Sequence, residues 1–168
     1  MIIYVTGPES TGKTTLAQSL SAHYDCPWVP EYARQYLHET DGKYDYRDLA
    51  RISKGQYGLK AQFEHAMPEK LICDTGQEVL YIWSEYKFGK VDPDIKGKLA
   101  LQKGALHLLC KPDITWEPDP QREHPLERNL LFRQYEKLLE HYGLDYNIVD
   151  GLGEVRLRNT VALIDAFV

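Results

Sequence analysis

The sequence predicts an α/β fold, in which a five-stranded parallel sheet lies between two layers of helices. Two observations support this class. Short apolar runs alternate along the chain with longer segments of helical periodicity, which is typical of strands that are covered on both faces. A glycine-rich segment with the spacing of a phosphate-binding loop follows the first apolar run. The prediction is therefore the three-layer α/β/α fold of the P-loop NTPases.

Composition favours one globular domain over residues 1–168, since 43% of the chain is hydrophobic and 27% is charged. The formal net charge of −5 disfavours a nucleic-acid or membrane-surface partner, because such binders usually carry basic patches. No apolar run reaches the roughly 18 residues of a membrane span, and Met1–Thr6 lacks the pattern of a secretory leader. The three cysteines form no C-x-x-C pair, so we expect a cytoplasmic protein.

The strands and helices follow from the spacing of apolar residues and from the turn residues between them. The predicted strands are Ile2–Thr6, Pro27–Pro30, Lys70–Asp74, Ala105–Cys110 and Tyr146–Val149. The predicted helices are a segment from the glycine loop to Tyr24, Asp45–Met67, a helix that starts near Thr75 or Gly76, Leu126–Tyr142 with Leu130 in its apolar stripe, and a closing helix from Leu157 to Val168.

The glycine-rich segment GPESTGKTT matches G-x-x-x-x-G-K-[ST]. Glycines allow the backbone to curl so that successive N–H groups and a helix N-terminus face a polyphosphate. Lys13 adds a positive charge for the β- and γ-phosphates, and the Thr14 hydroxyl is the expected ligand of Mg²⁺. The expected ATP-binding residues are Gly7, Glu9, Ser10, Thr11, Gly12, Lys13, Thr14 and Thr15.

Acidic residues follow two other predicted strands. In P-loop proteins Mg²⁺ is commonly steadied by an acidic residue at the end of a neighbouring strand, and Asp74 ends the run LICD. Asp74 can also cap the helix that follows. Glu31 comes just after the second strand, where a carboxylate can accept a proton from a substrate hydroxyl, and Arg34 one turn later can hold negative charge. The alternative is a helix-start glutamate with an exposed arginine.

The segment 111–125, KPDITWEPDPQREHP, contains four prolines and many charges, so we expect a surface lid loop. Arg122 is its only arginine and is the candidate that stabilises the transferring phosphoryl group; Arg128 can assist or can be a solvated helix residue. Trp116 in the lid and Trp83 can each stack on a flat ring, although packing in the core is an alternative for both.

These motifs together resemble the ribosylnicotinamide kinase domain of the NadR proteins. The resemblance rests on GPESTGKTTLAQ, VPEYARQYL, the pair Gly55-Gln56, CDT and the lid segment, and it covers essentially the whole chain. NadR proteins also carry an adenylyltransferase domain and sometimes a helix-turn-helix module, which 168 residues do not accommodate. The resemblance therefore implies only the kinase activity.

The implied reaction is transfer of the γ-phosphate of ATP, with Mg²⁺, to the 5′-hydroxyl of nicotinamide riboside (NR). In this resemblance Glu31 faces the hydroxyl, Asp74 serves Mg²⁺ and Arg122 closes over the phosphates. The family motif Asp-Thr-Asp reads Asp74-Thr75-Gly76 here, which changes the expected acceptor contacts. Two alternatives stay open, a kinase for another nucleoside and a nucleotide-binding regulatory ATPase.

Overall fold

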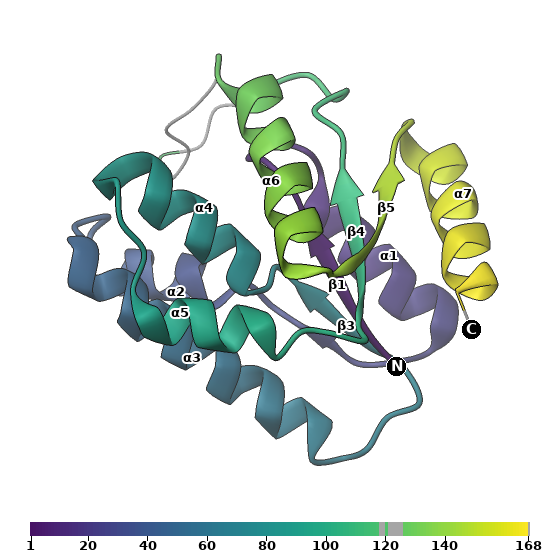
Figure 1. Ribbon diagram of the computed structural model, residues 1–168. Coiled ribbons are helices and arrows are strands. Elements are labelled where there is room, and N and C mark those ends of the chain that lie inside the picture. The colour runs from purple at the N-terminus through teal and green to yellow at the C-terminus, as the bar shows by residue number, and fades with distance from the viewer. Residues whose placement is uncertain (118–119, 121–125, 168) are drawn as a thin grey trace.

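The computed structural model describes residues 1–117, 120 and 126–167 (Figure 1). Its strands form one all-parallel sheet in the order β2-β3-β1-β4-β5. The strands are β1 (Ile2–Thr6), β2 (Trp28–Val29), β3 (Leu71–Asp74), β4 (Leu106–Cys110) and β5 (Asp145–Val149). All five predicted strands are therefore confirmed, and their predicted ends differ by one residue or less.

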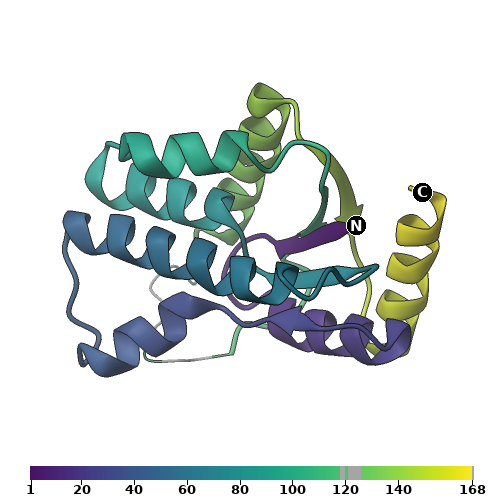
Figure 2. The same ribbon diagram turned by 90° about the horizontal axis from the view of Figure 1, so that it is seen from below.

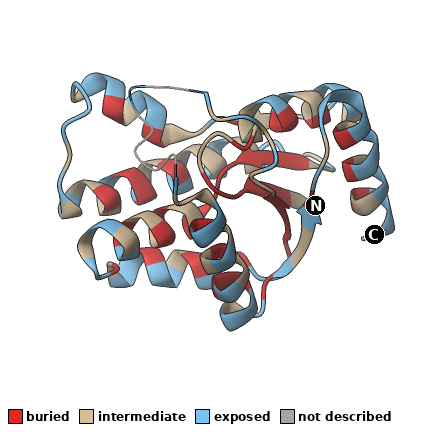
Figure 3. Ribbon diagram, turned by 90° about the horizontal axis from the view of Figure 1, so that it is seen from above, coloured by how far each residue is buried: buried red, intermediate tan, exposed pale blue. Residues whose placement is uncertain are grey.

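The described part of the chain has seven helices, and six of them cover the two faces of the sheet, while α2 packs on α3 (Figures 1 and 2). The helices α1 and α7 pack on one face, and α3 to α6 cover the other. Buried residues lie on the strands and on the inward sides of these helices, as the colouring of the ribbon shows (Figure 3). The helices are α1 (Lys13–Tyr24), α2 (Tyr32–Glu39), α3 (Tyr46–Glu64), α4 (Gln77–Phe88), α5 (Pro93–Ala100), α6 (Arg128–Tyr142) and α7 (Gly153–Ala166).

The register of the sheet brings three chain segments to one edge. Val5 pairs with Asp74, and Val29 pairs with Cys73, so the glycine loop after β1, Asp74 and Glu31 leave neighbouring strands at nearly the same level. The chain leaves β1 through α1 on one face and leaves β3 through α4 on the other. A crevice at the carboxyl ends of β1 and β3 is where open α/β sheets bind ligands.

The predicted helices are present, but two helices were not predicted and one predicted contact is wrong. The helix α5 carries only Ile95 and Leu99 as buried side chains, which is too short a stripe to detect by periodicity. The helix α2 is also short, and it begins immediately after Glu31. Leu130 is 52% exposed and does not join the apolar stripe of α6, which starts at Arg128 rather than Leu126.

The two glycines of α3 have different surroundings. A Cβ on Gly55 would lie 2.1 Å from Cε1 of Tyr32, whereas a Cβ on Gly58 would meet nothing within 4 Å. The neighbouring Gln56 accepts a hydrogen bond from the Tyr32 amide at 2.7 Å and donates to the Pro30 carbonyl at 3.3 Å. The pair Gly55-Gln56 therefore fixes the segment that carries Glu31 against α3.

These surroundings predict opposite effects of one substitution at two positions. Gly55→Ala should lower the free energy of unfolding by about 1–3 kcal/mol, because the ring of Tyr32 must move. Gly58→Ala should raise it by about 0.5–1 kcal/mol, because alanine is the better helix former and has room. Urea denaturation measures both variants, and equal effects at the two positions would contradict this packing.

Candidate active site

The loop between β1 and α1 is shaped by glycines at both ends. Gly7 has φ 129° and its backbone packs so closely on β4 that a Cβ would lie 2.8 Å from the Cys110 carbonyl oxygen. Gly12, at φ 72°, is the N-cap of α1. Within the loop, the Thr11 hydroxyl donates to the Pro8 carbonyl at 2.8 Å. The curl and the following helix N-terminus form an anion-binding site of the kind that the motif predicts.

Lys13 lies across this loop. Its ammonium donates to the carbonyls of Gly7 at 2.9 Å and Pro8 at 2.7 Å. An ammonium has three N–H donors, so a third remains for a ligand phosphate. These two bonds hold the positive charge beside the loop amides.

Asp74 is 1% exposed and lies at the end of β3 beside the loop. Its Oδ1 is buried without a hydrogen-bond partner among the described residues. An unsatisfied carboxylate oxygen near the Thr14 hydroxyl fits Mg²⁺, which prefers oxygen ligands and keeps several waters. In the described ranges no three His, Cys, Asp or Glu side chains form a metal site, so an ion here would depend on nucleotide phosphates and water for its other ligands.

The environment of Asp74 disfavours its charged form. Burial, followed by the negative charge of Glu31, raises the pKa of Asp74 to about 6. A hydrogen bond with Thr14 and the positive charges of Lys13 and Arg34 oppose this shift. The carboxylate is therefore ionised at neutral pH, at a cost in stability.

Glu31 follows β2 and is the N-cap residue of α2. Its Oε2 is 3.3 Å from Nε of Arg34, one turn later, and the Glu31 side chain is 19% exposed. The two residues are thus neighbours at the cavity wall, as their spacing predicts. The pairing is also compatible with the simpler alternative of a helix-start ion pair.

One cavity of about 820 Å³ joins these groups. Its lining includes the glycine loop from Gly7 to Thr15 together with Glu31 and Arg34. The rest of the wall is largely apolar and aromatic, with Trp83 held by a 2.9 Å hydrogen bond from its Nε1 to the Tyr44 hydroxyl. Other lining residues of this part are Ala33, Leu37, Val79, Ile82, Tyr86, Leu131 and Tyr135.

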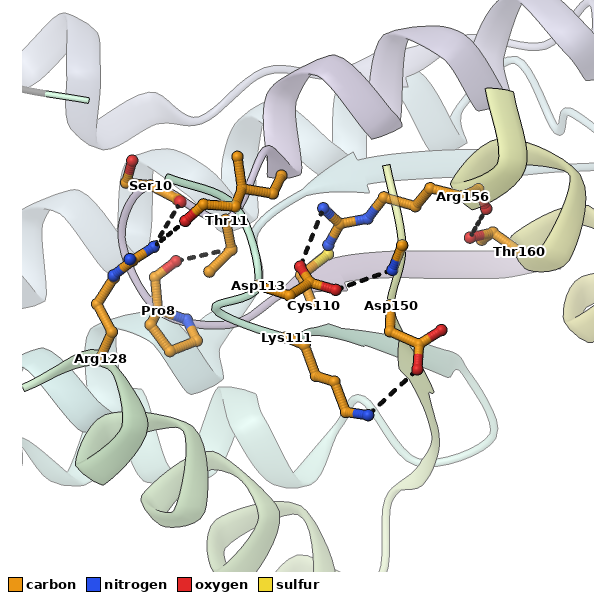
Figure 4. Close-up of polar contacts among 12 residues, drawn as sticks. Pro8, Ser10, Thr11, Cys110, Lys111, Asp113, Arg128, Asp150, Arg156 and Thr160 are labelled. Carbon is orange, nitrogen blue, oxygen red and sulfur yellow. Dashed lines mark hydrogen bonds and ion pairs between the residues drawn. The ribbon is translucent and has the colours of Figure 1, made fainter. Parts of the chain in front are cut away.

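The described part of the lid is fastened to the glycine loop by Arg128 (Figure 4). Its Nη1 donates to the carbonyl of Ser10 at 3.1 Å and to the carbonyl of Ile114 at 2.8 Å. Its guanidinium also lies 5.7 Å from the centre of the Trp116 ring. Trp116 is not among the described residues that line the cavity, so the structure places it against Arg128 instead. Arg122 lies outside the described residues.

Gly76 faces away from the cavity and into a buried polar cluster. A Cβ at this position would lie 2.5 Å from Oε2 of Glu78 and 2.7 Å from the ring of Tyr4. Glu78 accepts hydrogen bonds from the Gly76 amide at 3.0 Å and from Gln102 at 2.7 Å, and Gln102 also contacts Nε2 of His107. Burial lowers the pKa of His107, which keeps the ring neutral. With this backbone, a side chain at residue 76 would not enter the cavity.

The glycine loop between β1 and α1 of an all-parallel sheet defines a P-loop α/β fold. Residues 2–156 match the family model described as an AAA domain, and the chain therefore belongs to that family. No curated protein matches the chain by sequence. No helix within the described residues has the length and apolar character needed to cross a membrane.

Several solved structures share this fold. A NadR protein in complex with NR has a TM-score of 0.81 and 23% identity, covering 99% of this chain and 51% of that one. Deoxyadenosine kinase from M. mycoides, with products dcmp and dcdp, has a TM-score of 0.62 and 14% identity. The match covers 99% of this chain and 100% of that one. Thymidylate kinase from Ehrlichia chaffeensis has a TM-score of 0.66 and 13% identity, covering 98% of each chain. The chain thus spans about half the length of NadR, and at these identities the likeness establishes the fold.

The burial of Asp74 predicts a pH-dependent gain in stability from Asp74→Asn. Because the pKa of Asp74 is raised from 3.8 to about 6, the folded state favours the neutral carboxyl group. The stabilisation by this neutral group is fully present below about pH 4 and is lost as the pH rises through 6. Asn stays neutral, so above pH 6.5 the metal-free variant should be more stable than wild type by up to about 3 kcal/mol. Below pH 4 the difference should vanish.

Urea denaturation of both proteins between pH 4 and pH 8 measures this effect. Asp150→Asn is the control, because Asp150 is 57% exposed and its ion pair with Lys111 should contribute little. A stability difference for Asp74→Asn that does not change with pH would contradict the burial argument.

Proposed function

We propose that the protein is a small-molecule kinase that transfers the γ-phosphate of ATP to the 5′-hydroxyl of NR and gives nicotinamide mononucleotide. The observation that supports this most is the single cavity that joins the glycine loop to Glu31. A donor on the loop and an alcohol beside Glu31 would occupy the same cavity. The proposal also rests on the motifs shared with the NadR kinase domain, and it places the protein in the salvage of NAD precursors.

In the proposed mechanism the glycine loop binds the phosphate donor, and Glu31 and Arg34 act on the acceptor. The amides of residues 9–15, with Lys13, hold the triphosphate and neutralise charge on the transferred group. Glu31 accepts the proton of the attacking hydroxyl, and Arg34 holds the carboxylate in place. Trp83 offers a flat face to the base of the acceptor. Arg122, outside the described residues, and Arg128 are the lid cations of this proposal.

Thr14 and Asp74 would hold Mg²⁺, which supplies neutralisation of phosphate charge when it is bound. Asp74 is too deeply buried to line the cavity, so it would act on the ion through Thr14 or an ordered water. Glycine in place of aspartate at residue 76 does not remove a carboxylate from the cavity, because a side chain at this position would face Glu78. The departure from Asp-Thr-Asp is thus compatible with NR as the acceptor.

A second candidate is a kinase for another nucleoside. The fold is shared with deoxyadenosine kinase and thymidylate kinase, and the aromatic wall of the cavity suits any flat base. A regulatory ATPase is the remaining alternative, in which the loop would bind and slowly hydrolyse ATP without an acceptor.

Incubation of the protein with ATP, Mg²⁺ and a panel of ribosides separates the three functions. We expect phosphorylation of NR in preference to cytidine, thymidine and deoxyadenosine. Turnover of another nucleoside while NR stays unmodified would favour the second candidate. ADP release that no acceptor accelerates would favour the regulatory ATPase.

Glu31→Gln tests the proposed general base. The substitution keeps the size of the side chain but removes the proton acceptor, so kcat should fall by roughly 10²- to 10⁴-fold while ATP affinity changes little. Glu39→Gln is the matched control, because Glu39 lies at the end of the same helix, is exposed and pairs only with Gln35 among the described residues. Steady-state kinetics of both variants measure this, and unchanged turnover of Glu31→Gln would remove the assignment.

A further inference from the structure

Besides Lys13 and Arg128, a third cation lies beside the glycine loop, and it comes from the far end of the sequence. Arg156 belongs to the first turn of α7 and is 4% exposed. Its guanidinium reaches from α7 toward Asp113 and the end of β4 (Figure 4). A Cβ on Gly12 would lie 3.6 Å from Nη1 of Arg156. The cation is therefore packed directly behind the N-cap of α1.

The charge of Arg156 is poorly compensated by the protein. Its Nε, Nη1 and Nη2 atoms are buried and have no hydrogen-bond partner in the part of the chain that the structure describes. Oδ1 of Asp113 lies 3.9 Å from Nη1, beyond hydrogen-bond distance, and Oδ2 of Asp113 accepts from the Gly151 amide at 2.8 Å. Burying a guanidinium in this way costs free energy unless an anion approaches.

The other cations of the site are held differently. Lys13 donates to two carbonyls of the loop, and Arg128 donates to two carbonyls of the loop and lid. Arg156 makes no such bonds among the described residues, yet its Nη1 would lie only 3.6 Å from a Cβ on Gly12, the N-cap residue of α1. The anion that best compensates it is a phosphate group bound at those amides.

We propose that Arg156 is a positioning residue of the nucleotide site. Its buried positive charge attracts the phosphates of the bound nucleotide, so that the binding affinity rises with each phosphate group. Arg156 is among the residues that line the cavity, but its nitrogen atoms are buried, so it acts on a bound phosphate through its charge rather than through a direct hydrogen bond. Charges interact more strongly through the interior than through water, so a short separation across Gly12 suffices. This inference rests on the proposed function, because it requires a nucleotide on the loop.

Calorimetric titration with ATP, ADP, AMP and adenosine tests this role in Arg156→Met. ATP affinity should fall by about tenfold or more, ADP and AMP should lose progressively less, and adenosine should change by less than about twofold. Arg158→Met is the matched control, since Arg158 is an exposed arginine two residues later on α7 and its loss should leave all four affinities unchanged. Arg156→Lys, which keeps the charge, should retain most of the ATP affinity.

Thermal unfolding separates this role from a structural one. The ligand-free Arg156→Met protein should melt at or above the wild-type temperature, because an unsatisfied buried cation is removed. Arg156→Gln gives the same comparison if the Met variant does not fold. Equal losses for ATP and adenosine, or wild-type ATP affinity in the neutral variants, would overturn the inference. A wild-type protein that binds no ATP would refute the proposed function itself.

Discussion

The parallel pairing of β1 with β3 is the constraint on which the rest of the site depends. It places Val5 opposite Asp74, so that the glycine loop and the buried carboxylate leave the sheet side by side. The pairing of β2 with β3 then adds Glu31 at almost the same level. A shift of either strand along the sheet would separate the loop from one of these carboxylates, and the hydrophobic residues that face α1 and α3 to α6 on the two sides prevent such a shift.

The buried polar atoms that lack hydrogen bonds in the described part of the chain, and therefore lower the stability of the fold, lie near this end of the sheet. Within the described residues, the buried side-chain atoms that lack hydrogen-bond partners belong to Thr6, Asp74 and Arg156. Folded proteins pair nearly all such atoms, so five unpaired atoms on three residues near one loop fit the proposal that these groups serve a ligand rather than stability. Elsewhere buried polar groups are paired, as in the cluster of Glu78, Gln102 and His107.

Much of the fold and part of the candidate site could be predicted from the sequence. The strands were predicted because buried parallel strands are short and almost continuously apolar, and the loop was predicted because its motif has fixed spacing. The helices α2 and α5 were missed because tertiary packing, not a long apolar stripe, stabilises them. Arg156 had no sequence signal, since only the fold brings α7 behind Gly12. The reason for Gly55 likewise appears only when Tyr32 is seen packed on it.

The central claim is that a nucleoside triphosphate on the glycine loop faces an acceptor alcohol at Glu31 within one cavity. A crystal structure of the protein with Mg²⁺, a non-hydrolysable ATP analogue and NR tests it most directly. The account predicts phosphate oxygens within hydrogen-bond distance of the amides of residues 9–15 and the 5′-hydroxyl of NR within that distance of the Glu31 carboxylate. Phosphates bound away from the loop, or an acceptor hydroxyl directed away from Glu31, would contradict it.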